Sequence, residues 1–264
     1  MKILLILSDL YKFKKNLLGG GEYLKFISAT DIGLVRSENQ DNVYVDELEG
    51  GIFAVLCDGM GGENSGSEAS SLAVNAVSEM FSSLYRKNFS AEAVEKTLTM
   101  SVSAANSDIY SEACSDDEKF GMGTTCVCAF VSPENIHIIN VGDSRAYIFD
   151  EKGFRQITND HTVVNMLLSQ GRITKDEVEN HPQRNMLIKA VGVEPEIEPD
   201  YFKIKTPEKF TLMLCSDGLC GYCSDKEIED VLKNSSFEQS AQELIKLAIG
   251  KGGRDNITVA VIAE

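Results

Sequence analysis

The sequence predicts an α+β fold in which antiparallel sheets are sandwiched between helices. Strand and helix patterns follow one another in blocks: strands, two helices, strands, an irregular insertion, a strand, two helices and a last strand. This order lacks the regular strand–helix–strand alternation of a parallel, doubly wound sheet. In addition, two apolar strand patterns, within residues 53–59 and 210–218, each end in Asp-Gly. Similar strand ends are therefore expected in both halves of the chain.

Composition limits the size of the domain and the kinds of partner. At 264 residues with 43% hydrophobic content, the chain can bury a sizeable core in one large domain or two small ones. Its net charge of −16 disfavours nucleic acid and anionic membranes as partners, because both require a basic surface. We therefore expect neither class of partner.

The cysteines and the N-terminus indicate the cellular compartment. Cys57, Cys126, Cys128 and Cys215 lie inside apolar runs, which predicts buried, reduced thiols. The apolar run at residues 3–7 is too short for a signal peptide or a transmembrane helix. We expect a cytoplasmic protein.

The first half of the chain contains strand patterns on either side of two helix patterns. Residues 1–22 precede them as an expected appendage that ends in three glycines, a flexible joint. The helices are predicted because apolar residues recur at steps of three and four. Three successive strands with short connections then predict an antiparallel meander. The predicted strands are 24–29, 43–45, 53–57, 124–131, 135–140 and 145–149, and the predicted helices are 69–84 and 94–109.

The second half begins with a polar, irregular block at residues 161–192, which we expect to be an insertion or flap. The block contains a capping box at Thr174 and Glu177. Regular patterns return afterwards. They predict a strand at 210–215, a helix capped at Ser224, a helix at 237–250 and a strand at 257–263.

The strongest functional signal lies in residues 53–62. Five apolar residues predict a strand buried on both faces, and Asp58 follows it directly, before a glycine-rich turn. A carboxylate at the mouth of a buried strand, beside backbone that a ligand can approach closely, suits an oxygen-liganded divalent metal. The alternative is an ordinary Asp-Gly turn that closes a hairpin. This stretch alone leaves both interpretations open.

Two further acids lie at the edges of buried strand patterns, Asp217 after one strand and Asp255 before the last. Buried carboxylates are destabilising unless their charge is compensated, which divalent cations would do. Several Asp side chains without a His or Cys ligand set favour Mg²⁺ or Mn²⁺ over zinc. Cys220 and Cys223 have a zinc or redox spacing, but no second pair completes four ligands.

Short motifs rich in Asp and Gly recur along the chain. They are Arg36…Asn39-Gln40-Asp41, Asp58-Gly59-Met60-Gly61-Gly62, Gly121-Met122-Gly123-Thr124-Thr125, Val141-Gly142-Asp143-Ser144-Arg145, Ser216-Asp217-Gly218 and Gly253-Arg254-Asp255-Asn256. In this order and approximate spacing the series resembles the metal-dependent protein serine/threonine phosphatases, the PPM or type 2C family, in their compact bacterial form. The resemblance covers about residues 24–264, and a whole series in register is far more specific than any single motif.

The resemblance implies a four-layer α-β-β-α sandwich, two antiparallel sheets flanked by helices, within a domain of residues 23–264. It also implies a centre of two Mn²⁺ or Mg²⁺ ions. Asp58 would bridge these ions, and the carbonyl of Gly59 would complete the first. Asp217 and Asp255 would hold the second ion, with Asp41 linked to the cluster directly or through water.

The implied activity is hydrolysis of phosphoserine and phosphothreonine on proteins by a metal-activated water, without a covalent intermediate. Arg36 matches the arginine that grips the substrate phosphate, and its planar fork suits bidentate contact. Arg36 and Asp58 are thus the expected catalytic residues, and Gln40, Glu63 and Asn256 are expected to support the metal ligands from outside. The expected partners are phosphorylated proteins, including a serine/threonine kinase that the enzyme opposes, and we expect a monomer.

The sequence departs from the family pattern at Glu63, where relatives often carry His, and this change bears on leaving-group protonation. Asp143 and Arg145 are expected to be mainly structural. Many bacterial members also bind a third, weaker ion through an acid near the Gly121 motif. The candidate ligands here are Asp116, Asp117 and Glu118.

Two other classes of function share some of these features. A pseudophosphatase would bind phosphoproteins without turnover, but the intact Asp58, Asp217, Asp255 and Arg36 disfavour it. A metal-dependent nuclease would use a similar acid cluster, but the net charge of −16 disfavours a polyanionic substrate.

Overall fold

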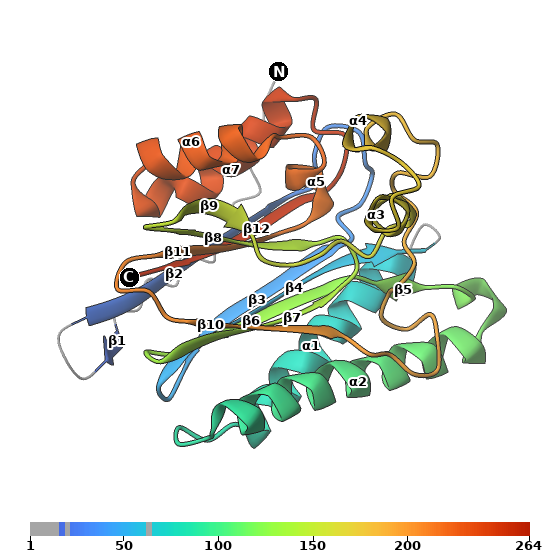
Figure 1. Cartoon of the computed structure of the whole chain (residues 1–264). Coiled ribbons are helices and arrows are strands. Elements are labelled where there is room, and N and C mark those ends of the chain that lie inside the picture. The colour runs from blue at the N-terminus through green and yellow to red at the C-terminus, as the bar shows by residue number, and fades with distance from the viewer. Residues whose placement is uncertain (1–15, 19–21, 62–64) are drawn as a thin grey trace.

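Two antiparallel sheets pack face to face, with helices on both outer faces (Figure 1). The computed structural model describes residues 16–18, 22–61 and 65–264. One sheet has the order β1-β2-β12-β11-β8-β9, and the other has the order β10-β7-β6-β4-β3, with β5 paired to the end of β4. The predicted four-layer sandwich is confirmed.

The strand bounds are as follows. The first sheet contains β1 (Asn16–Leu18), β2 (Glu22–Asp31), β8 (Arg145–Asp150), β9 (Gly153–Gln156), β11 (Thr211–Cys215) and β12 (Ile257–Ala263). The second contains β3 (Asp41–Leu48), β4 (Gly51–Met60), β5 (Gly123–Thr124), β6 (Cys126–Val131), β7 (Asn135–Val141) and β10 (Asp200–Lys205).

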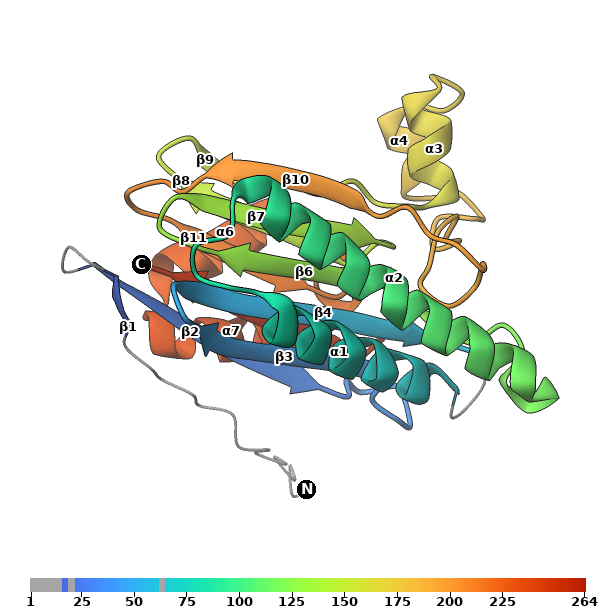
Figure 2. The same cartoon turned by 90° about the horizontal axis from the view of Figure 1, so that it is seen from below.

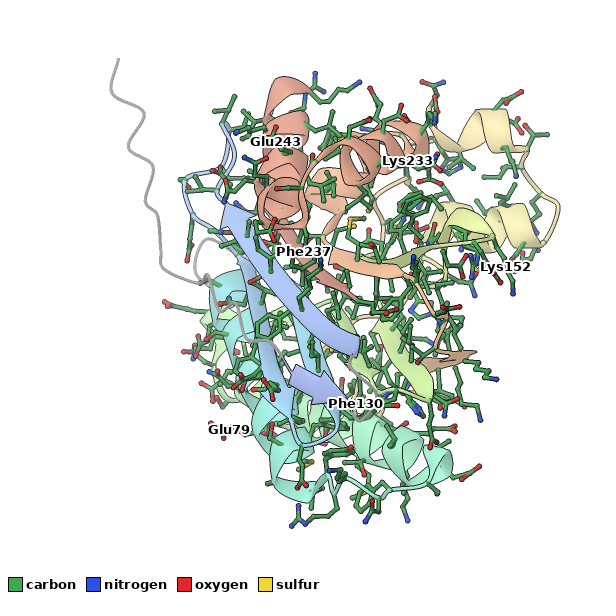
Figure 3. All side chains as sticks on the ribbon, turned by 90° about the vertical axis from the view of Figure 1, so that its left-hand side faces the viewer. Glu79, Phe130, Lys152, Lys233, Phe237 and Glu243 are labelled. Carbon is green, nitrogen blue, oxygen red and sulfur yellow. The ribbon has the colours of Figure 1, made fainter. Side chains whose placement is uncertain are left out.

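Helices cover the outer face of each sheet. The second sheet carries α1 (Ser65–Leu84) and α2 (Ala91–Ser115), and the first carries α5 (Asp217–Cys220), α6 (Asp225–Asn234) and α7 (Phe237–Gly250). Figure 3 views the sandwich from the side on which β1 and β2 lie, with Glu79 of α1 at one outer face and Glu243 of α7 at the other.

Burial on both faces explains why β4 consists almost entirely of apolar residues. Phe53 packs under the helices, where its ring stacks on Phe81 of α1 with 4.6 Å between ring centroids. Its neighbours Ala54 and Leu56 instead face the other sheet and join the core between the sheets. Both side-chain rows are therefore removed from water, as the apolar run predicts.

The predicted meander is wrong in its third strand. β6 and β7 pair as expected, but β8 pairs with β11 in the other sheet. The turn between β7 and β8 makes this crossing at Gly142, whose φ of +100° favours glycine. A side chain at Gly142 would also lie 2.6 Å from the Thr125 side chain. The crossing places the residues of this turn at the end of the sandwich where β4 and β11 end.

Residues 161–192 form no strand of the two sheets and carry two short helices, α3 (Val163–Ser169) and α4 (Lys175–Val178) (Figure 2), while Val191 near their end is buried and bridges to Thr124 of β5. The predicted capping box at Thr174 and Glu177 is present. At the base of this segment, His161 donates its backbone N–H to the Gly142 carbonyl over 2.9 Å. The His161 side chain is buried there, between the Gly142 backbone and Asp200.

Parts of the expected N-terminal appendage join the sheet. Asn16–Leu18 forms β1, which pairs antiparallel with the beginning of β2. Residues 1–15 and 19–21 lie outside the described residues, and so does Glu63. Within the part of the chain that the structure describes, no helix is long and apolar enough to cross a bilayer.

Candidate metal centre

Four of the predicted ligands come from both sheets and meet at one end of the sandwich. Asp41 is the first residue of β3 and lies directly opposite Asp58 of β4 in the antiparallel register. Asp217 follows β11 in the other sheet, and Asp255 lies two residues before β12. Residues opposite each other on antiparallel strands point to the same face, so Asp41 and Asp58 present two carboxylates side by side.

Burial and mutual repulsion raise the pKa values of the Asp41, Asp58 and Asp217 carboxyl groups. Burial raises the pKa of Asp41 to about 7, with the charge of Asp217 adding to the rise. Burial also raises the pKa of Asp58 well above its ordinary value, and the charges of Asp41 and Asp217 raise it further. The pKa of Asp217 is raised to about 6 by burial and by the charge of Asp255. Such groups need a cation or a proton to remain buried.

Hydroxyl groups hold two of the carboxylate-bearing segments in place. The Ser216 hydroxyl donates to Oδ2 of Asp41 over 2.7 Å and accepts from the backbone N–H of Thr258. The Thr125 hydroxyl accepts from the backbone N–H of Asp58 over 2.9 Å. Neither hydroxyl was among the predicted site residues, although Ser216 and Thr125 both belong to the motifs of the sequence.

Gln40 and Asn256, predicted to support the metal ligands, connect the β2–β3 loop to the entry of β12. The side-chain oxygen Oδ1 of Asn256 accepts from the backbone N–H of Gln40 over 2.9 Å. The amide nitrogen of Asn256 donates to the carbonyls of Ile32 and Glu38. One buried side chain thus fixes the loop that carries Arg36 against the segment that carries Asp255.

Arg36 lies at the exposed edge of the acid cluster. Its guanidinium donates to Oδ2 of Asp255 over 2.8 Å, and 52% of its side-chain surface is exposed. This hydrogen bond raises the pKa of Arg36, and the charges of Asp217 and Asp58 add to the effect. The guanidinium is therefore anchored to the cluster while part of it faces solvent.

Gly59 follows Asp58 where the first turn of α1 passes over β4. A Cβ at this position would lie 1.9 Å from the backbone carbonyl oxygen of Gly66. The Gly59 N–H donates to the Gln40 carbonyl over 3.0 Å. Only glycine allows this close approach of the two backbones.

The cluster offers oxygen donors, including a buried one without a partner among the described residues, and these suit a hard divalent cation. Oδ1 of Asp41 is buried without a hydrogen-bond partner among the described residues, which is the kind of orphaned oxygen that a cation compensates. The available donors are oxygens, as Mg²⁺ and Mn²⁺ prefer. Within residues 16–18, 22–61 and 65–264, however, no group of three or more His, Cys, Asp or Glu side chains is already arranged to hold an ion. Some of these carboxylates are instead held by Ser216 and Arg36.

The remaining candidates have different surroundings. Asp143 lies near the cluster, because its charge contributes to the raised pKa of Asp58. Arg145 instead donates from Nε and a terminal nitrogen to Asp160, over 2.9 and 2.7 Å, which is a structural arrangement. Cys220 and Cys223 are free thiols in the core. Asp116, Asp117 and Glu118 are exposed in and beside the short 3₁₀ helix η1 (Asp117–Lys119), and a third ion there stays a prediction.

Comparison with known proteins gives consistent matches over most of the chain. The family model described as Protein phosphatase 2C matches residues 35–258. The serine/threonine phosphatase stp of Listeria welshimeri is 38% identical over 242 residues, which cover 88% of this chain and 93% of that protein.

Solved structures agree with this match. The serine/threonine phosphatase Stp1 from Staphylococcus aureus superposes with a TM-score of 0.85 at 34% identity, covering 95% of this chain and 99% of that one. The catalytic domain of the phosphatase PstP, solved in complex with two manganese ions, gives a TM-score of 0.78 at 31% identity, covering 91% and 97%. We conclude that this chain belongs to the protein phosphatase 2C family.

Proposed function

We propose that the protein is a metal-dependent phosphatase that hydrolyses phosphoserine and phosphothreonine on other proteins. The observation that carries this proposal is the cluster of Asp41, Asp58, Asp217 and Asp255, with Arg36 at its exposed edge. Family membership and the names of the similar phosphatases from Listeria and Staphylococcus support the same activity.

In this proposal the cluster would hold two Mn²⁺ or Mg²⁺ ions, and the similar PstP catalytic domain was solved in complex with two manganese ions. The Asp58, Asp217 and Asp255 carboxylates and the Gly59 carbonyl are the groups that would hold these ions. Asp41 supports the pair from the neighbouring strand. When bound, the ions would activate a water for in-line attack on phosphorus and offset the charge on the phosphoryl oxygens.

The role of Arg36 is to bind and orient the phosphate of the substrate. Its contact with Asp255 holds the guanidinium at the cluster edge, so that little side-chain freedom is lost when an anion arrives. A guanidinium offers two parallel N–H donors to a phosphate, which fixes the orientation of the phosphorus. Hydrolysis by water requires no nucleophilic side chain, and none is assigned.

The proposed activity implies particular substrates and an opposing enzyme. Phosphorylated proteins are the substrates, and a serine/threonine kinase supplies the reaction that this enzyme reverses. We further propose that residues 23–264 form the catalytic domain, that residues 161–192 serve as its flap, and that the enzyme acts as a cytoplasmic monomer. The acidic net charge of −16 supports protein substrates over nucleic acid.

Phosphate release from a phosphothreonine peptide tests the proposal, with Mn²⁺, with Mg²⁺ and with EDTA. We expect metal-dependent turnover in the native protein and a loss of at least 100-fold in Asp58→Asn, on the order of what removal of a principal electrostatic group costs. The matched control is Asp230→Asn, which changes an exposed carboxylate on α6 and should retain activity. Tight metal binding without turnover would instead favour a phosphoprotein-binding pseudophosphatase.

A further inference from the structure

Two aliphatic side chains project into solvent directly before Arg36. Leu34 and Val35 are each 68% exposed, and they lie in the connection between β2 and β3, which we call the 32–36 loop. In Figures 1 and 2 this connection reaches the same end of the sandwich as α3 and α4. Adjacent, largely exposed aliphatic residues beside a site mark a candidate contact surface.

Three hydrogen bonds anchor residues 32–34 of the 32–36 loop, two of them to the segment before β12 and one to Asp31 at the end of β2. The Leu34 N–H donates to the Gly253 carbonyl over 2.6 Å. The Asn256 side chain donates to the Ile32 carbonyl over 3.0 Å, and the Gly33 N–H donates to the side chain of Asp31 over 2.8 Å. The exposure of Leu34 and Val35 is thus a fixed feature of the loop.

Close backbone packing explains why these side chains cannot turn inward. A Cβ at Gly33 would lie 2.3 Å from the Asp255 carbonyl oxygen, so the loop already contacts the segment beneath it. Gly253 likewise has no side chain, and a Cβ there would lie 2.9 Å from Cγ of Leu34. The base of Leu34 therefore rests on Gly253, two residues before Asp255, while its remaining surface faces solvent.

We propose that Leu34 and Val35 form a docking surface for aliphatic side chains that flank the phosphorylated residue of a protein substrate. This inference rests on the proposed function, in which Arg36 binds the phosphate. Successive Cα atoms are about 3.8 Å apart, so both side chains start within about 8 Å of the Arg36 Cα atom. An extended peptide rises about 3.3 Å per residue. The two residues on either side of the phosphorylated residue can therefore reach Leu34 and Val35.

Continuity with Arg36 identifies the occupant of this surface. A phosphopeptide bound at the Arg36 guanidinium is held next to the 32–36 loop, because Leu34 and Val35 directly precede Arg36 in the chain. Phe120, which is 86% exposed, stands beside η1 in a different connection and offers a matched comparison. Burial of about 50 Å² of apolar surface corresponds to about a tenfold gain in binding.

The experiment compares two phosphothreonine peptides that differ only in their flanks, two aliphatic residues on each side in one and two serines on each side in the other. In the native protein we expect kcat/KM to favour the aliphatic peptide about tenfold, mainly through KM, because docking stabilises bound substrate and transition state equally. In Leu34→Ser/Val35→Ser the ratio should fall to about one. The control Phe120→Ser should keep the native ratio.

Each outcome decides between the inference and its alternatives. Equal kcat/KM for both peptides in the native protein, or an unchanged ratio in the double variant, would overturn the docking surface. A native protein that hydrolyses neither peptide nor p-nitrophenyl phosphate contradicts the proposed function itself. If the double variant instead changes the sedimentation behaviour of the protein and leaves the ratio intact, the surface joins two copies of the chain, and the inference is wrong.

Discussion

Asp41 and Asp58 face each other across the β3–β4 pair, at the end of the sandwich where both sheets contribute carboxylates. Directly opposed like charges destabilise an antiparallel pair. The Ser216 hydroxyl satisfies one oxygen of Asp41, while the other has no partner among the described residues. The fold therefore holds a local electrostatic conflict that an added positive charge can resolve.

This conflict predicts how the stability of the metal-free protein depends on pH. The pKa of Asp41 rises from 3.8 to about 7 on folding, so the folded state keeps a proton that the unfolded state releases. The resulting stabilisation is complete below pH 4 and is lost as the pH rises through 7. In EDTA, Asp41→Asn should show a smaller fall in melting temperature between pH 5 and pH 8 than the native protein. Identical pH profiles for the two proteins would contradict this account.

Added metal should raise the stability of the protein at high pH, where the metal-free protein loses stability. Divalent cations bind the folded state and favour its ionised carboxylates, so they should raise the melting temperature most where the metal-free protein is least stable. At pH 8 we expect 1 mM Mn²⁺ to raise the melting temperature of the native protein by on the order of 5 °C. The rise should be much smaller in Asp58→Asn, as differential scanning fluorimetry can measure, and an equal rise would place the ions elsewhere.

His137 predicts a separate loss of stability in acid. Burial lowers the pKa of His137 from 6.5 to about 4, and Nδ1 lies 2.8 Å from the Tyr201 hydroxyl. Because its pKa is lower in the folded state, His137 binds a proton in the unfolded state first as the pH drops. The free energy of unfolding therefore falls between about pH 6.5 and pH 4, by at most about 3 kcal/mol. In urea unfolding, the free energy of unfolding of His137→Gln should fall less between pH 6.5 and pH 4 than that of the native protein. Tyr201→Phe serves as the control, because it removes the hydroxyl and keeps the histidine buried.

Arg36 should matter far more for activity than for stability. An ion pair that is half exposed contributes about 0–1 kcal/mol, whereas loss of a phosphate-binding fork removes a charge-assisted contact to the reacting group. We expect Arg36→Ala to lower kcat/KM for a phosphopeptide by about 100-fold with little change in melting temperature. Arg36→Lys should recover only part of the activity, since lysine lacks the fork. A large loss of stability in either variant would show that Arg36 is primarily structural.

Gly59 should be intolerant of any side chain. The backbone oxygen of Gly66 would lie 1.9 Å from a Cβ at Gly59, so Gly59→Ala requires α1 to move away from β4. We expect a loss of several kcal/mol in the free energy of unfolding, in the range of core overpacking or more. Gly250→Ala is the matched control. It has no atom within 4 Å of its Cβ position and an ordinary φ, so it should be neutral or slightly stabilising.

The local hydrophobic pattern predicts the bounds of those elements whose burial follows one pattern from end to end. The strand Ile257–Ala263 and the helix Phe237–Gly250 have the predicted bounds, because unbroken burial and apolar spacing mark them along their whole length. The sheet to which β8 belongs could not be predicted, since a short turn suits a meander and a crossing equally well. Its partner β11 lies more than 60 residues later in the chain, where no local signal reaches.

The same division applies to the site. Asp58 and Asp217 are recognisable because each ends a buried strand beside glycine. The Ser216 hydroxyl that holds Asp41 is not, because this contact spans 175 residues and depends on how the two sheets meet. The edge strand β10 was not predicted either, because its side chains are only partly buried and form no apolar run.

The placement of these acids on both sheets has a mechanical consequence. Asp41 and Asp58 lie on strands of one sheet, whereas Asp217 follows β11 and Asp255 precedes β12 of the other sheet. A ligand that contacts both pairs would join the two layers at this end, where the hydrogen bond from Ser216 to Asp41 already connects them. The two sheets can then separate at this end only when the ligand is released. The backbone amide protons next to these four acids should therefore exchange with solvent at similar rates.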